Sequence, residues 1–259
     1  MLFRVGLRDL LILCAFGAVW GGIWASFLCC MAWRLPRGVP LSKSSYCPSC
    51  GHRLLPPDLV PVFSWLLLGG RCRYCGAKIP AGHAAAEIAF AAASVLCLLQ
   101  YGITVLMVRN WLFLCCLLWI ALSDWDSEII SADLPCGIGL AVWLGSSFFT
   151  GTTMREAVVV LLQCVLVFAV GDLLLQFPIA LFAFGPFQGF GYHTVCAAVL
   201  SLAALYLRPL PALLSLGLAC ALLFLLRLAL RVERGGTARC GSMAGMMAVS
   251  SAAILLLGI

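Results

Sequence analysis

Long apolar runs set the strongest limit on what this chain can fold into. Hydrophobic residues make up 64% of its 259 residues and charged residues only 10%, with a mean hydropathy of +1.11. Soluble domains carry about 25% charged residues. A helix that crosses a bilayer needs about 20 consecutive, mostly apolar residues. The composition therefore predicts an all-α polytopic membrane protein.

Eight apolar runs are candidate transmembrane helices. They cover residues 10–33, 84–107, 111–124, 134–150, 157–176, 193–207, 210–230 and 241–258. The first run ends in WRLPRG without the small-residue cleavage site of a signal peptide, so we expect a retained membrane helix. The sequence thus divides into a first helix over 1–33, a polar loop over 34–83 and a membrane-embedded part of about seven helices over 84–259.

Basic residues in the polar loop indicate how the chain is oriented. The loop contains seven Lys and Arg residues: Arg34, Arg37, Lys43, Arg53, Arg71, Arg73 and Lys78. Positive loops stay on the cytoplasmic side, so we expect this loop in the cytoplasm. Because successive connections lie on alternate sides of the membrane, we expect 124–133 and 188–192 on the cytoplasmic side and the connection 108–110 on the outer side. Basic residues that set the membrane topology account for the formal charge of +6. We therefore expect no nucleic-acid partner.

The polar loop contains two CxxC pairs. Cys47 and Cys50 form the first, and Cys72 and Cys75 form the second. Two such pairs supply four thiolates to one tetrahedral zinc ion and leave no position for a reacting water. We therefore predict a structural zinc site that folds a loop too short for its own core. A redox pair and an iron–sulfur centre remain as alternatives, and His52 is expected to be a surface residue.

Acidic residues near the membrane are candidate functional groups, because ionisable groups there are costly. Asp124 follows an apolar run directly, and Asp172 has apolar residues on both sides. Two aspartates brought together can share a proton and act as general base and acid, as in aspartyl proteases. The same residues fit a proton-coupled transporter.

The other acids near the membrane have a plainer interpretation as well. Asp126, Glu128 and Asp133 follow Asp124 and fit a solvated turn equally well. Glu87 begins the second span, and we expect it to be structural, with Arg34 or Lys78 as its partner.

Three stretches of the chain resemble one known protein family. ASFLCCMAWRLPRG at 25–38 is similar to the family's first-helix ending, SFLNVVIYRLP. The tetracysteine loop, with VPVFSWLLLGGRCRYCGAKIP at 60–80 and then Glu87, resembles the family's cytoplasmic domain. DWDSEIISADL at 124–134 is similar to its first catalytic motif, D-x-D-x-x-L-L-P-D. The family that these stretches resemble is that of the bacterial type IV prepilin peptidases.

The resemblance implies a GxGD-type intramembrane aspartyl protease of the bacterial inner membrane. Such an enzyme cuts the leader of a type IV pilin or type II secretion pseudopilin precursor after glycine, on the cytoplasmic side. It then methylates the new N-terminus with S-adenosylmethionine. The implied partners are these precursors and the lipid bilayer. By position, Asp124 corresponds to the first catalytic aspartate.

The second catalytic motif of the family, G-x-G-D-x-K, is changed in this chain. GFGYHTV at 189–195 keeps the two glycines, but Tyr192 stands at the aspartate position and Thr194 at the lysine position. Tyrosine, with an ordinary pKa near 10, stays protonated and cannot replace a carboxylate in a proton-sharing pair. Asp172, which follows Gly171, is the available substitute. The candidate catalytic pair is therefore Asp124 and Asp172.

The changed motif leaves two main hypotheses open. The chain is a prepilin peptidase with a rewired aspartate pair, or a catalytically degenerate relative that acts in pilus or secretion assembly without cleavage. A small transporter with Asp172 as its proton site is the third, but the basic tetracysteine loop lends it no support.

Overall fold

The computed structural model describes the N-terminal half of the chain almost continuously. The described residues are 6–126, 133–151, 153, 155–156, 158–163, 165, 199, 203, 206 and 250–256. The described residues are mostly helical. The chain divides into two compact units, Met1–Met107 and Val108–Ile259. The spans expected over 157–176, 193–207, 210–230 and 241–258 lie wholly or largely outside the described residues.

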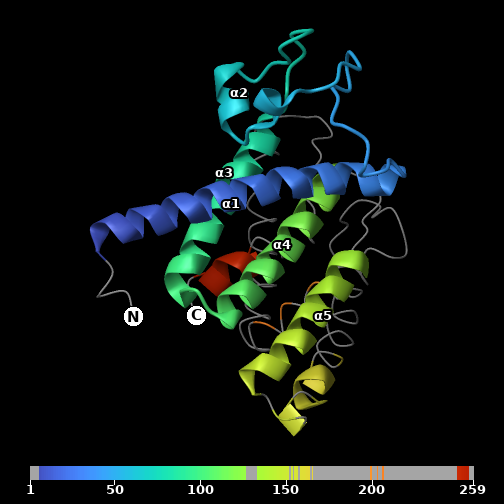
Figure 1. Cartoon of the computed structure of the whole chain (residues 1–259). Helices are drawn as coiled ribbons and strands as arrows, with labels where there is room; N and C mark the ends of the chain where they lie inside the picture. The colour runs from blue at the N-terminus through green and yellow to red at the C-terminus, as the bar shows by residue number, and fades with distance from the viewer. Residues whose placement is uncertain are drawn as a thin grey trace, which may run out of the picture. The chain divides into compact units, whose positions relative to one another are not determined.

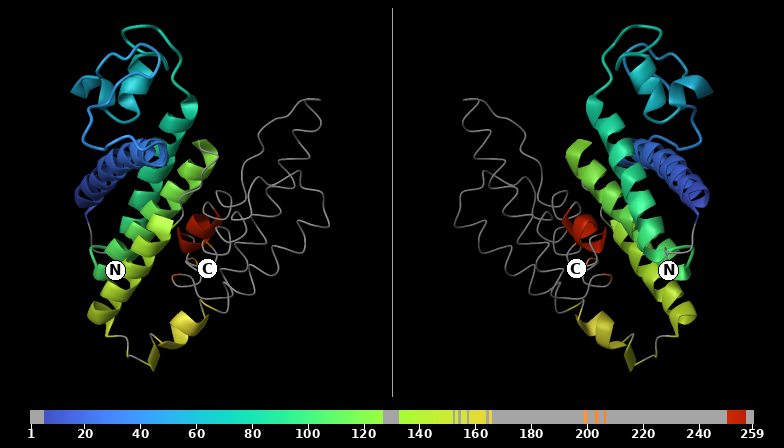
Figure 2. Two further views of the ribbon diagram at one scale, coloured as in Figure 1. Left: turned by 90° about the vertical axis from the view of Figure 1, so that its right-hand side faces the viewer. Right: turned by 90° about the vertical axis from the view of Figure 1, so that its left-hand side faces the viewer.

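Two long apolar helices frame the first unit. They are α1 (Leu7–Arg34) and α3 (Ala81–Tyr101), which cross each other in Figure 1 and Figure 2. Both are long and apolar enough to span a membrane, and so is Val105–Ser123 of the next helix. Large side chains on α1, such as Leu11 and Phe16, are more than half exposed, as expected for a surface that faces lipid. The spans expected to begin near residues 10 and 84 are therefore present as helices.

A close approach between α1 and α3 depends on two glycines of α1. A Cβ atom on Gly21 would lie 2.5 Å from Ser94 Oγ and 2.9 Å from Ala91 Cα, both on α3. At Gly17, one turn earlier, it would lie 3.3 Å from a Val95 methyl carbon. The spacing is that of the G-x-x-x-G motif, with which membrane helices bring their backbones together where no hydrophobic effect drives association. The helices α1 and α3 thus pack with their backbones close together at Gly17 and Gly21.

The connection between α3 and α4 lies earlier than the sequence predicted. We expected it at 108–110, but α3 ends at Tyr101 and α4 (Val105–Asp126) begins four residues later. Gly102 takes a positive φ of 62°, and the Thr104 hydroxyl accepts a hydrogen bond from Met107 N–H at 3.2 Å. These are a C-terminal glycine and an N-cap. Arg109, expected in the connection, consequently lies inside α4.

The second unit contains α4 beyond Met107 and α5 (Asp133–Thr150). Tyr206 connects the two helices. Its ring stacks on Phe113 of α4 with centroids 4.1 Å apart, and its hydroxyl donates to Gly139 O of α5 at 2.8 Å. The bounds of α5 agree with the span expected over 134–150.

Substituting Gly21 tests the α1–α3 contact. Gly21→Ala places a methyl group against the backbone of Ala91, and overpacking of this kind costs about 1–3 kcal/mol. We expect a lower midpoint in thermal denaturation of the detergent-solubilised chain, followed by tryptophan fluorescence. Gly82→Ala is the matched control, because nothing lies within 4 Å of that Cβ. An equal midpoint for both variants would contradict the contact.

Candidate functional site

The first CxxC pair folds into a tight knuckle between α1 and the short helix α2 (Phe63–Leu67). Gly51 N–H donates to Cys47 O at 2.8 Å, and Cys47 N–H donates to His52 O at 2.9 Å. Gly51 has a φ of 72°, which glycine adopts at little cost. A single antiparallel bridge between Tyr46 and Arg53 closes the base of the knuckle. The backbone thereby turns the two thiols toward the same side.

The second CxxC pair repeats this geometry before α3. Gly76 N–H donates to Cys72 O at 2.9 Å, and Cys72 N–H donates to Ala77 O at 2.8 Å. Gly76 has a φ of 71°, and Arg71 pairs with Lys78 in an antiparallel bridge. The two knuckles are therefore the same local structure built twice.

The two knuckles bring the four predicted cysteines into one cluster, Cys47, Cys50, Cys72 and Cys75. All four sulfurs lie within 4.8 Å of one another, and Cys47 Sγ is 3.9 Å from Cys75 Sγ. Tetrahedral zinc with Zn–S bonds of about 2.3 Å separates its sulfurs by about 3.8 Å. The donor set and spacing fit a metal such as zinc, as the sequence predicted.

The protonation of the cluster is uneven before any metal binds. Hydrogen bonding from the Cys50 backbone, the largest influence, lowers the pKa of Cys47 to about 6. For Cys75, the Ala77 backbone lowers the pKa, but desolvation and the three other cysteines outweigh it and raise the pKa to about 11. The Cys47 thiolate thus forms readily, whereas a cation must displace a proton from Cys75.

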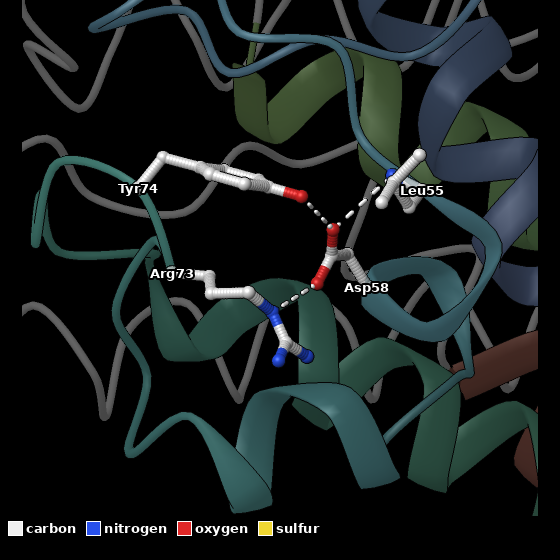
Figure 3. Close-up of polar contacts among 4 residues, drawn as sticks. All are labelled: Leu55, Asp58, Arg73 and Tyr74. Atoms are coloured by element: carbon white, nitrogen blue, oxygen red, sulfur yellow. Dashed lines mark hydrogen bonds and ion pairs between the residues drawn. The ribbon is translucent and has the colours of Figure 1, made fainter.

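Asp58 connects the second knuckle to the segment between the two knuckles (Figure 3). It lies in a short 3-10 helix, Pro56–Leu59, and its carboxylate accepts from Arg73 Nε at 2.7 Å and from Tyr74 Oη at 3.0 Å. Leu55 N–H donates to the same carboxylate at 3.1 Å. The sequence analysis did not single out Asp58; the available signal was a lone acid in a basic loop, directly after two prolines.

These contacts set the charge state of Asp58. Desolvation raises the pKa of its carboxyl, but the bonds from Arg73, Leu55 and Tyr74 outweigh this effect and hold the pKa below its ordinary value. The Asp58 side chain is 4% exposed, against 51% for Arg73. Asp58 is therefore ionised at neutral pH and shielded from solvent.

Tyr74 joins the two knuckles independently of a metal. Its ring stacks on His52 of the first knuckle with centroids 3.6 Å apart, while its hydroxyl bonds to Asp58. His52 is exposed and lies outside the sulfur cluster, in agreement with its expected role as a surface residue. The thiols are therefore partly preorganised by protein contacts.

Arg34 fixes the start of the loop at the end of α1. Its side chain is 4% exposed in total and donates to four backbone carbonyls, those of Pro40, Leu41, Lys43 and Ser44. These bonds fold 40–44 back onto the helix end. Arg34 is thus not the partner of Glu87 that the sequence suggested.

Glu87 instead accepts a hydrogen bond from the backbone of Val62. Its Oε2 atom lies 2.7 Å from Val62 N. Val62 has a φ of 62° and a ψ of −52°, and Phe63 N–H donates to Pro61 O at 2.6 Å across it. This is a γ-turn of the strained kind, unusual for a β-branched residue; such a conformation costs about 1–3 kcal/mol. The structural role of Glu87 is to hold this turn.

The predicted catalytic residues are only partly described. Asp124 lies in the last turn of α4, which ends at Asp126, and Asp133 is the first residue of α5. Glu128, Asp172 and Tyr192 lie outside the described residues. The pairing of Asp124 with Asp172 therefore stays a prediction.

Comparison with known proteins identifies the part of the chain that carries this site. Residues 19–101 match the model of the bacterial peptidase A24 N-terminal domain. A prepilin leader peptidase/N-methyltransferase of Myxococcus xanthus is 35% identical over 130 residues, covering 46% of this chain and 39% of that protein. An enzyme of the same name from Bacillus subtilis is 30% identical over 114 residues, 44% of each chain.

The matches cover less than half the length of these relatives, and no solved structure matches the chain significantly. The matched region includes both knuckles, Glu87, and Gly21 and Gly22 of α1. The chain therefore contains a region similar to the bacterial peptidase A24 N-terminal domain, and relatives that match it are named prepilin leader peptidase/N-methyltransferase.

Proposed function

We propose that this protein is a prepilin leader peptidase of the bacterial inner membrane. It would cut the leader of a type IV pilin or type II secretion pseudopilin precursor after glycine on the cytoplasmic side. The observation that carries this proposal is the match over residues 19–101 to the A24 N-terminal domain. We assign 1–33 to the first membrane helix, 34–83 to the cytoplasmic metal loop and 84–259 to the catalytic membrane part.

We propose zinc as the ion of the tetracysteine cluster, with a structural role. Four thiolates close a tetrahedral shell and leave no open position, so the ion would supply an electrostatic cross-link between the knuckles. Two of the proposed ligands, Cys47 and Cys72, are each 7% exposed, whereas Cys50 and Cys75 are exposed, so the ion would be partly shielded from solvent.

We propose Asp124 and Asp172 as the catalytic pair. Two carboxyl groups that share one proton divide the work of the reaction. The ionised group takes a proton from the attacking water, and the protonated group donates to the scissile carbonyl oxygen. The position of Asp124 at the end of α4 supports this role, because a substrate cut at the membrane surface must meet the acids at a helix end. Methyl transfer from S-adenosylmethionine to the new N-terminus is a further part of the proposal.

Tyr192 supports a second candidate function. It stands where the family's second motif carries aspartate, so a chain that retains the metal loop but no longer cleaves is the alternative. Such a protein would bind prepilins or secretion components during assembly.

Cleavage in cells separates the two functions. Co-expression with a type IV prepilin, in a strain without its own peptidase, is expected to give a shortened product on an immunoblot. Removing a general acid or base costs about 10²–10⁴-fold in rate, so we expect Asp124→Asn to abolish processing, with Asp9→Asn as the unaffected control. Intact cleavage in Asp172→Asn would exclude the rewired pair. Cleavage that appears only after Tyr192→Asp would establish the alternative.

Metal analysis tests the cysteine cluster. The purified chain is expected to contain one zinc per molecule by mass spectrometric metal analysis, and Cys50→Ser should lose most of it, because the shell needs all four thiolates. Cys14→Ser in α1 is the control and should keep full content. Equal zinc in both variants would show that the ion binds elsewhere.

Acidification is expected to release the zinc before it disturbs the Asp58 contacts. In the metal-free loop the pKa of Cys47 is lowered to about 6 from 9.0, so protons compete with zinc for its sulfur as the pH falls through about 6. The contacts of Asp58 hold the pKa of its carboxyl below its ordinary value, so its carboxylate stays ionised at a lower pH than an ordinary aspartate does. A chelator dye should report zinc release between pH 7 and 5. Retention of the ion down to pH 4 would contradict this order.

A further inference from the structure

Exposed apolar side chains gather on α2 (Phe63–Leu67) and the residues before it. Phe63, Leu66 and Leu67 are 64%, 59% and 86% exposed, and Leu59 and Val60 are 42% and 44% exposed. These five residues are called the apolar ledge below. Contiguous apolar patches of this kind on otherwise polar surfaces usually mark sites covered by a membrane or a partner.

The opposite side of α2 is anchored within the loop, which fixes the ledge facing outward. Trp65 Nε1 donates to Ile79 O at 3.3 Å. Gly70 lies against the Trp65 ring so closely that a Cβ there would be 2.9 Å from it. With Trp65 held inward, its neighbours on the helix cannot turn into the loop.

The ledge is attached to both membrane helices of its unit. Pro61 packs against α1, where a Cβ on Gly22 would lie 3.5 Å from the proline ring. Val62 N–H is bound by Glu87 at 2.7 Å, and Glu87 is the seventh residue of α3, about 9 Å along the axis from its first residue. Figures 1 and 2 show the loop that carries α2 beside the N-terminal end of α3. The ledge is therefore held within two turns of the end of a spanning helix.

The charge of the loop favours lipid as the occupant. The loop contains seven basic residues and one acidic residue, Asp58, which forms an ion pair with Arg73. Lys43, Arg53, Arg71 and Lys78 are exposed. Amphipathic segments that combine exposed cations with large apolar side chains insert about 5–10 Å into the boundary between headgroups and acyl chains, and anionic headgroups attract such cations.

We propose that the apolar ledge is inserted into the acyl boundary of the adjacent leaflet. The tetracysteine loop is then anchored to the membrane surface through the ledge, rather than extending freely into the aqueous phase. The Glu87 bond to the strained turn at Val62 sets the depth of the ledge. The exposed basic residues of the loop would then be available to the lipid phosphates.

Photo-crosslinking in the full chain tests this insertion. p-Benzoylphenylalanine replaces Leu67 in the ledge or, as the matched control, Ser49, which is exposed in the first knuckle. Each protein is reconstituted into vesicles of phosphatidylethanolamine and phosphatidylglycerol and irradiated. We expect a mass increase of one phospholipid at position 67 and none at position 49. A protein adduct at 67, within the chain or to a second copy, or a lipid yield equal to that at 49, would overturn the proposal.

Glu87 variants test what sets the depth of the ledge. Glu87→Ala removes the acceptor for Val62 N–H, whereas Glu87→Gln keeps a carbonyl oxygen in its place. We expect Glu87→Ala to lose most of the lipid adduct at position 67 and Glu87→Gln to retain it, with zinc content equal in both. An undiminished adduct in Glu87→Ala would show that Glu87 does not hold the ledge in the bilayer.

Discussion

The close contact of α1 with α3 at Gly21 is the constraint on which the rest of the first unit depends. The loop of residues 34–83 begins at one of these helices and ends at the other, so their separation sets the span that it must bridge. Because Ala91 Cα would lie 2.9 Å from a Cβ at Gly21, the two backbones are nearly in contact. The same two helices also hold the loop. Gly22 of α1 lies against Pro61, and Glu87 of α3 accepts a hydrogen bond from Val62 N–H.

The tetracysteine loop is stabilised in two independent ways. The thiols converge from two copies of one knuckle, and Tyr74 links those knuckles through His52 and Asp58. A loop of this length buries too little apolar surface to fold by packing alone. Side-chain contacts that bring the knuckles together before the ion binds reduce the entropy lost when four ligands close around it.

The sequence was sufficient for features set by spacing along the chain. Two residues between paired cysteines determine the knuckle, so the cluster was predicted correctly, and long apolar runs located α1, α5 and the C-terminal part of α4. The sequence was insufficient for contacts between residues that only the folded course of the chain brings together. Asp58 meets Arg73 across 15 residues, and the partner of Glu87 is a backbone N–H, which no side-chain pattern reveals. The end of α3 was misplaced because hydropathy continues through Gly102 and Thr104, where only local capping marks the turn. The partner of Asp124 lies beyond the described residues, so that part of the candidate site remains a sequence-based prediction.

The four carbonyl bonds of Arg34 give the loop an attachment that does not depend on an opposite charge. Its described partners are neutral backbone dipoles, and a guanidinium stays protonated at any pH that proteins tolerate. Changes in acidity or ionic strength that weaken carboxylate pairs therefore leave this anchor in place. Lysine, with a single ammonium group and no planar fork, would reach fewer of these carbonyls. The exit of the chain from its first membrane helix thus keeps its geometry while the metal cluster beyond it gains or loses protons and its ion.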